Sequence, residues 1–375
     1  MTTRCRHALV ELGRRADRRT GSIDAYLVVR DEAARLPYMF EHHRGLGVER
    51  FFVVDNASAD GTAEFLAGQS DCYAYRTTAS FAEANHGMDW INALVERHGD
   101  SNWCLFADAD ELLTYPHADR MPLRDLCAFL DRSGYEGLFA TLLDMYPDGP
   151  VARADYVSGT PFLDTCRHHD TGYRLRSKVR INPTRPAFAE VEAVGGPRLR
   201  VFYPELARAG RWRMALLRTL RGIRLHPVGK KLGLGRLGSP LPPDLTKIPL
   251  VKGAPGRRWI SNHRTTPLRL SPVTGALLHF KFFSDFHRRA VAEAARGEHW
   301  DGGSEYLRYA EQLSRDPNAT LMHAGSEAFR SPGRLVDLGI MASGPELDRL
   351  FPGARAPVRN PVPAPAMRVA RAHRF

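Results

Sequence analysis

The chain has 375 residues, with 53 lysines and arginines against 42 acidic residues and a formal net charge of +11. No run of residues approaches the ~18 apolar residues of a membrane-spanning helix, and the basic N-terminus lacks the apolar core of a signal peptide. The five cysteines are odd in number and widely spaced, which argues against a disulfide framework or a Cys-x-x-Cys zinc site. We therefore expect a cytoplasmic protein with reduced thiols, soluble or bound at the inner face of a membrane.

Composition divides the chain into five segments. A basic N-terminal arm (1–21) precedes an α/β core (22–204). A basic insertion (205–265) separates this core from its C-terminal part (266–350), where helices are predicted at about 283–296 and 304–314. The last residues (351–375) form a Pro/Ala/Arg-rich tail that we expect to be disordered.

Apolar runs alternate with segments of helical periodicity in the first third of the chain. Strands are predicted at 23–29, 50–54, 72–75 and 103–107, and helices at Leu36 to His43, at Phe65 and Leu66, and over 81–98. Ser58 or Asp60 is expected to cap the second of these helices. Strands that alternate with helices predict a mostly parallel sheet, whose strand ends deliver acidic and amide residues to one crevice.

Two carboxylates one residue apart, Asp108 and Asp110, follow the last of these strands. Two anions held close together are unfavourable unless a cation lies between them, and hard ions such as Mg²⁺ or Mn²⁺ prefer carboxylate oxygens. The pattern therefore favours a metal site at the edge of the sheet. The alternative is that the pattern arises by chance and that Asp110 caps the following turn.

Three blocks together resemble family 2 glycosyltransferases: residues 27–32, 53–62 and 106–113. More narrowly, they resemble the bacterial subgroup whose first block reads Arg-Asn-Glu and whose third reads Asp-x-Asp-Glu. The resemblance covers about residues 22–145 and extends more loosely to about 315. It implies a GT-A fold, a nucleotide-sugar donor and a divalent metal. One departure is Asp31, which stands where the subgroup has Asn and adds negative charge beside the nucleotide.

The resemblance also assigns roles to single residues. Asp108 and Asp110 are expected to hold Mn²⁺ or Mg²⁺ against the donor's diphosphate. The residues expected to bind the nucleotide lie at the strand ends: Arg30, Asp31, Glu32, Asp55, Asn56 and Asp108. For Arg30, an ion pair with a neighbouring carboxylate is an equally good interpretation. Asp60 is expected to cap a helix more than to touch ligand.

His279 lies in a further apolar run, 276–282, ahead of a predicted helix. In the subgroup, a histidine in a similar block can supply a third metal ligand. The alternative for a lone histidine in a strand is a hydrogen-bonded core residue. Both interpretations stay open on the sequence alone.

A direct displacement needs a carboxylate that takes the proton of the acceptor hydroxyl. Four acidic residues after a predicted strand at 137–143 are candidates for this base: Asp164, Asp170, Glu190 and Glu192. We rank Glu192 and Asp170 first, because they lie in irregular segments well after the metal motif. Basic residues that alternate with apolar ones over 173–180 predict a strand with a basic face, for an anionic ligand or for solvent.

The positive charge is concentrated in the insertion. Between 205 and 264 there are fourteen lysines and arginines against two acids. Over 211–224, Trp212, Leu216, Leu220 and Ile223 fall within about 80° on a helix and arginines cover the other side. This pattern is typical of a helix at an anionic membrane surface, and equally of a helix docked on its own core. The Gly- and Pro-rich run 227–255 predicts a loop that closes over donor or acceptor.

Three other classes of protein match the sequence less well. An aspartate-nucleophile phosphatase has Thr or Val where this chain has Leu112, and a nucleotidyltransferase usually has an early Gly-rich loop, whereas residues 27–35 contain no glycine. A nucleic-acid-binding protein would interleave aromatic residues with the basic ones, so no nucleic acid is expected as a partner. The sequence favours a metal-dependent glycosyltransferase that moves a sugar from a nucleotide-diphosphate donor to a saccharide or lipid-linked acceptor, with inversion as the resemblance implies.

Overall fold

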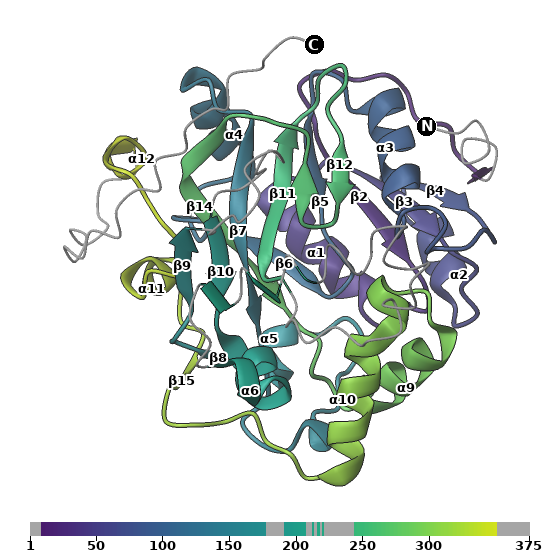
Figure 1. Ribbon diagram of the computed structural model, residues 1–375. Coiled ribbons are helices and arrows are strands. Elements are labelled where there is room, and N and C mark those ends of the chain that lie inside the picture. The colour runs from purple at the N-terminus through teal and green to yellow at the C-terminus, as the bar shows by residue number, and fades with distance from the viewer. Residues whose placement is uncertain are drawn as a thin grey trace.

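The computed structural model describes residues 9–177, 191–207 and 244–350, with five further positions between 212 and 220 (Figure 1). A nine-stranded sheet has the order β1-β4-β3-β2-β5-β11-β7-β14-β6. Its strands are β1 (Val10–Leu12), β2 (Ile23–Val29), β3 (Arg50–Asp55), β4 (Cys72–Arg76), β5 (Trp103–Phe106), β6 (Glu111–Thr114), β7 (Gly137–Asp144), β11 (Thr246–Lys252) and β14 (Leu270–His279). Six strands run in one direction, and β1, β11 and β6 run in the other. The predicted α/β class with a mostly parallel sheet and flanking helices is confirmed.

The helices flank this sheet (Figure 1). They are α1 (Leu36–Leu46), α2 (Thr62–Ala67), α3 (Met88–His98), α4 (Leu123–Arg132), α5 (Phe162–Thr165), α6 (Pro204–Ala207), α9 (Phe286–Arg296), α10 (Ser304–Arg315), α11 (Pro332–Asp337) and α12 (Pro345–Leu350). Short turns of helix occur at η2 (Val151–Arg153), η3 (Arg198–Phe202) and η5 (Trp300–Gly303). Three two-stranded sheets pair β9 (Arg174–Ser177) with β10 (Val191–Val194), β12 (Trp259–Ser261) with β13 (Arg264–Thr265), and β8 (His168–Asp170) with β15 (Ser326–Ala328).

The central strands are apolar on both faces because helices cover both. In β3, Phe51 and Val53 join a core cluster with Leu36 and Phe40 of α1, while Phe52 joins a second cluster with Trp90 of α3. Successive side chains of a strand point to opposite faces. A strand buried on both faces therefore has a continuous apolar sequence, and this pattern predicted β2, β3 and β5.

Two helix starts differ from the predictions. Gly61, with φ of 94°, occupies the N-cap position of α2 in place of Ser58 or Asp60, but Asp60 Oδ1 still accepts a hydrogen bond from the first N–H of this helix, that of Thr62, at 3.1 Å. α3 begins at Met88 instead of residue 81, because Asn85, His86 and Gly87 all have positive φ. Three consecutive left-handed residues cannot continue a right-handed helix.

β11 lies inside the segment predicted as a basic insertion, yet it runs antiparallel between β5 and β7 in the central sheet. Its register shifts between Lys247 and Leu250, and this irregularity contains Pro249. Proline has no N–H to donate, so a bulge is where a central strand tolerates it. Residues 246–252 therefore belong to the core and not to a peripheral loop.

Only part of the basic insertion is described. Trp212, Leu216 and Leu220 are helical and exposed by 72%, 51% and 52%, whereas Leu217 packs against the core cluster around Tyr203. Ile223, residues 227–243, the arm before residue 9 and the tail 351–375 lie outside the described residues. Among the helices that the structure describes, none is long and apolar enough to cross a bilayer.

Candidate functional site

The polar residues of the site lie where the sheet strands end or begin along one edge. The parallel strands β2, β3, β5, β7 and β14 bring their carboxyl ends to this edge, and the antiparallel strands β6 and β11 begin there. The strand register places His279 of β14 directly beside Asp144 of β7 and Glu111 of β6. Ligands of open α/β sheets usually bind at such an edge.

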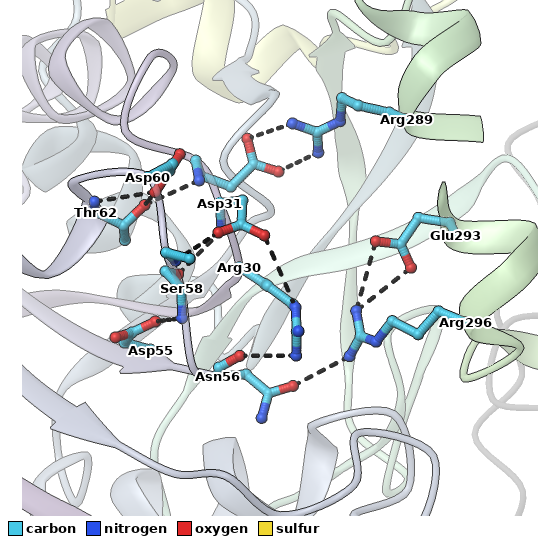
Figure 2. Close-up of polar contacts among 12 residues, drawn as sticks. Arg30, Asp31, Asp55, Asn56, Ser58, Asp60, Thr62, Arg289, Glu293 and Arg296 are labelled. Atoms are coloured by element: carbon cyan, nitrogen blue, oxygen red, sulfur yellow. Dashed lines mark hydrogen bonds and ion pairs between the residues drawn. The ribbon is translucent and has the colours of Figure 1, made fainter. Parts of the chain in front are cut away.

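The loops after β2 and β3 are bonded to each other (Figure 2). The Asp31 N–H donates to Ser58 Oγ at 3.0 Å, and Asp31 Oδ1 accepts from Ala59 N at 2.7 Å. Asp60 Oδ2 accepts from Ala33 N at 3.0 Å. Asp31 has φ of 54°, a region that Asn and Asp tolerate better than other side chains. Asp31 and Asp60 thus shape these loops, and aspartate at position 31 meets the same backbone demand as asparagine.

Asp55 and Asn56 are both buried. Asp55 Oδ1 accepts from Ser58 N at 2.8 Å, while Oδ2 accepts no hydrogen bond from the described residues and has only Arg76 at 3.9 Å. The Asn56 amide donates to the carbonyls of Thr77 and Ala79. A buried carboxylate oxygen without a donor is costly, so Asp55 is the residue of this pair that is suited to receive a ligand's N–H or O–H.

Helix α9 contributes two arginines that face these loops (Figure 2). Arg289 makes a bidentate ion pair with Glu32, and Arg296 donates to Asn56 Oδ1 at 3.2 Å. On the loop side, Arg30 donates to the Asn56 carbonyl at 3.2 Å and lies 3.9 Å from Asp31. Glu32 is therefore occupied by a protein cation. Arg296 also lies 3.4 Å from Glu293 and 3.4 Å from Glu298, so both guanidinium groups of α9 have carboxylate partners within the protein.

Asp108 and Glu111 share a buried lysine. Lys247 Nζ lies 3.1 Å from Asp108 Oδ2 and 2.8 Å from Glu111 Oε1. Burial alone lowers the pKa of Lys247, but the two carboxylates outweigh it and hold that pKa above its ordinary value. Burial also raises the pKa of Glu111, against the effect of Lys247. The ammonium group is the charge that keeps these two acids together.

Asp110 and His279 form a second polar pair. His279 Nε2 lies 3.4 Å from Asp110 Oδ2, and its Nδ1–H donates to Asp144 Oδ1 at 2.7 Å. Arg198 Nε donates in turn to Asp144 Oδ2 at 2.8 Å. Burial raises the pKa of Asp110, but His279 outweighs it and holds that pKa well below its usual range. Burial lowers the pKa of His279, and the two aspartates raise it above its ordinary value.

The donor set of Asp110 and His279 fits a divalent ion. A histidine that donates its other ring N–H to a carboxylate is the usual arrangement of a metal-binding imidazole. In the described part of the chain, no group of three or more His, Cys, Asp or Glu side chains is placed to hold an ion. Two protein ligands are nevertheless sufficient where phosphate oxygens and water complete the coordination, as is common for Mg²⁺.

The two candidate bases have different surroundings. Glu192 is buried in β10, and the next residue, Ala193, donates its N–H to Thr246 Oγ1 at 3.2 Å, beside Lys247. Asp170 lies in β8 and accepts from Tyr146 at 2.6 Å and Arg200 at 3.1 and 3.2 Å, with His323 at 3.1 Å. Glu190 and residues 178–180 of the predicted basic strand lie outside the described residues.

Sequence reasoning missed the residues that complete the site. They are Asp144, Arg198, Lys247, Arg289 and Arg296. Asp144 ends a predicted strand, so the rule that pointed to Asp55 could have found it. The basic residues come from β11, η3 and α9, and no local sequence pattern indicates which basic residue will pair with which acid.

Comparisons with known proteins add little. No protein-family model matches the chain, and no curated protein matches it. Among solved structures, the chain is similar to one described as a glucose-1-phosphate thymidylyltransferase from Bacillus anthracis in complex with a sucrose, with 8% identity and a TM-score of 0.22. The match covers 37% of this chain and 65% of that one, just under two thirds of its length. Similarity this low carries no conclusion about function, and the likeness to family 2 glycosyltransferases remains one of sequence blocks.

Proposed function

We propose that this protein is a metal-dependent glycosyltransferase that transfers a sugar from a nucleoside-diphosphate donor to a saccharide or lipid-linked acceptor, with inversion at the transferred carbon. The observation that supports it most is the Asp110–His279 pair at the end of β14, with Asp108 two positions before Asp110 in the loop after β5. Asp55 and the arginines of α9 lie at the neighbouring strand ends. The proposal combines these contacts with the resemblance of the three sequence blocks.

The neighbouring groups would each bind a different part of the donor. Asp55 Oδ2 would accept a hydrogen bond from the ribose or the base, since it is buried and lacks a donor in the described residues. Arg289 and Arg296 would face the diphosphate. Asp110 and His279 would hold Mn²⁺ or Mg²⁺, which when bound neutralises charge on the leaving diphosphate. Asp108, 41% exposed, would contact the donor beside the metal.

Thermal unfolding in the presence of nucleotides tests this proposal. UDP, GDP, CDP, TDP and ADP are added singly, each with and without Mn²⁺. A ligand at about 100 times its Kd stabilises the native state by roughly 2.7 kcal/mol and so raises the melting temperature. One diphosphate that stabilises only with Mn²⁺ would support the proposal and name the base. Stabilisation by a nucleoside triphosphate and a sugar phosphate, but by no diphosphate, would instead support a nucleotidyltransferase.

Glu192 is our choice for the base that takes the acceptor proton, because its strand packs beside the Asp108–Lys247 pair. We expect Glu192→Gln to lower kcat by roughly 10²–10⁴-fold and to leave the Kd of the nucleotide diphosphate unchanged. Asp170→Asn is the matched comparison: it breaks contacts with Tyr146 and Arg200, so we expect loss of stability with a smaller change in kcat. Product formation and nucleotide binding are measured on both variants. A larger kcat loss in Asp170→Asn would make Asp170 the base.

Contact with an anionic membrane is a second proposed property, favoured by the exposed Trp212, Leu216 and Leu220. They are spaced four residues apart, and Leu217 packs on the core, so the apolar side of this helical segment faces away from its own protein. The surrounding sequence is strongly basic. An apolar stripe with Trp and flanking arginines is typical of an interfacial helix.

Sedimentation with vesicles tests the membrane contact. We expect binding to phosphatidylglycerol-containing vesicles, and about tenfold weaker binding for Leu216→Ser, which removes one apolar side chain from the lipid. Leu307→Ser on α10, where the leucine is likewise 52% exposed, is the control and should bind as the unaltered chain does. Equal losses in both variants, or equal binding to neutral vesicles, would contradict the proposal.

A further inference from the structure

Lys247 stands out among the charged residues of the site because its side chain is only 2% exposed. It enters from β11, the antiparallel strand between β5 and β7, next to the register shift that contains Pro249. Its ammonium group lies over the Phe106 ring, 5.6 Å from the centroid, and reaches Asp108 and Glu111. The chain thus places a permanent cation inside the Asp-x-Asp-Glu motif.

Glu111 is fully occupied in this arrangement. One of its oxygens accepts from Lys247 at 2.8 Å, and the other accepts from the Asp108 N–H at 3.1 Å. Its side chain is 1% exposed, so it cannot turn toward a ligand without giving up its buried ion pair with the ammonium group. Asp108 shares the same cation through Oδ2. The acids at positions 108 and 111 therefore have their counter-ion already.

Asp110 points to a different partner. Its Oδ2 faces His279 and its main-chain carbonyl accepts from Phe280 N at 2.8 Å, which joins it to the end of β14. Asp110 lies between two motif acids that pair with Lys247, and it does not share their counter-ion. The three acids of the motif are thus divided into two groups with different partners.

We propose that Lys247 is a positioning residue that acts as the resident cation of the motif: it neutralises Asp108 and Glu111 and confines a divalent ion to Asp110 and His279. This inference deepens the proposed function, since it says which acids of the motif hold the metal of a glycosyltransferase. It also gives Lys247 a role that no local sequence pattern marks. The lysine keeps Asp108 in place for the donor and prevents a second ion from binding between Asp108 and Glu111.

Direct Mn²⁺ binding to the full chain, without nucleotide, tests whether Asp110 binds the ion while Asp108 and Glu111 pair with Lys247. The free ion is followed by electron paramagnetic resonance, and thermal unfolding reports the fold of each variant. We expect Asp110→Asn to weaken Mn²⁺ binding by at least roughly 10- to 100-fold, and Asp108→Asn to change it by less than about threefold. Lys247→Met should gain Mn²⁺ binding, because Asp108 and Glu111 then lack a cation. Lys247→Arg, which restores the charge, should bind as the unaltered chain does.

A second variant covers the case in which Lys247→Met does not fold. Lys247→Met combined with Glu111→Gln removes one charge of each sign, so it is expected to recover stability and to lose the gained Mn²⁺ site. The inference is overturned if Asp108→Asn loses Mn²⁺ as severely as Asp110→Asn, a comparison that applies even where Lys247→Met does not fold. It is also overturned if folded Lys247→Met binds no more Mn²⁺ than the unaltered chain. An unaltered chain that binds no Mn²⁺ even when a nucleoside diphosphate is added would contradict the proposed metal dependence, and a gain in Lys247→Met would still support the role of Lys247.

Discussion

An Asp110→Asn variant is expected to fold and to lose about 10³-fold in kcat/KM with a nucleotide-sugar donor, which corresponds to roughly 4 kcal/mol of transition-state stabilisation. Asparagine has the same shape, and the main-chain bond from Phe280 to the carbonyl of residue 110 does not depend on the side chain. The substitution removes the negative charge that raises the pKa of His279 and that would bind the metal. Mn²⁺-dependent stabilisation by the nucleotide should disappear with it.

Asp131→Asn is the matched control for this variant. Asp131 pairs with Lys252 at 3.1 Å, near the start of β5 and the end of β11, and so at the opposite edge of the sheet from the site. The two side chains are 29% and 46% exposed, so loss of the pair should change stability by less than about 1 kcal/mol and leave nucleotide binding intact. Steady-state rates and calorimetric nucleotide affinities, each with and without Mn²⁺, measure both variants. An Asp110→Asn protein whose Mn²⁺-dependent affinity is unchanged would falsify the metal assignment.

The part of the fold that could be predicted from the sequence consists of strands and helices that alternate along the chain and have clear local patterns of apolar residues. β2, β3 and β5 are apolar on both faces and end at Val29, Asp55 and Phe106, where polar residues resume within one or two positions. Because parallel strands share an edge, their ends could be placed together without knowledge of the pairing. The structure places His279 3.4 Å from Asp110, and their role as metal ligands stays a prediction.

The remainder depends on contacts between residues far apart in the chain. Lys247 and Asp108 are 139 positions apart, and Arg289 and Glu32 are 257 apart. Periodicity reports only which face of an element is buried, so it cannot choose a partner for a charged side chain. The sequence also failed to predict β11 for a local reason. Its Thr-Lys-Ile-Pro sequence contains a lysine, which is buried in a pair with two carboxylates, and a proline, which lies at a bulge.

The prediction of Asp170 and Glu192 as candidate bases was limited in the same way, because local patterns did not reveal the strands that contain them. Both were chosen because their segments looked irregular, whereas the structure places both in short strands. β8 pairs with β15, more than 150 residues later in the chain, and β10 pairs with β9. Strands of three or four residues carry too few alternating positions to be recognised. Their role as bases stays a prediction, to be decided by the variants proposed above.

An Arg50→Met variant is expected to lose about 3–5 kcal/mol of stability, because it leaves the carboxylate of Asp24 buried without its cation. Arg50 and Asp24 are 1% and 0% exposed, and two nitrogens of the guanidinium bond to the carboxylate at 2.8 and 2.6 Å. Ser22 and Asn102 also donate to Asp24, so one charge pair holds the starts of β2, β3 and β5 together. Methionine keeps most of the volume but none of the charge. The shift of the thermal or urea midpoint measures the loss.

Arg44→Met gives the matched comparison for Arg50→Met. Arg44 makes a similar bidentate pair with Asp71, but the two side chains are 38% and 26% exposed, so water replaces the lost partner. We expect less than about 1 kcal/mol from this change. Neither variant should alter Mn²⁺-dependent nucleotide binding, because Arg50 begins β3 and Asp55 ends it, roughly 16 Å away along the strand. Equal destabilisation of the two variants would show that burial does not govern the strength of these pairs. A loss of nucleotide affinity in Arg50→Met, in protein that is still folded, would show that the two edges of the sheet are coupled.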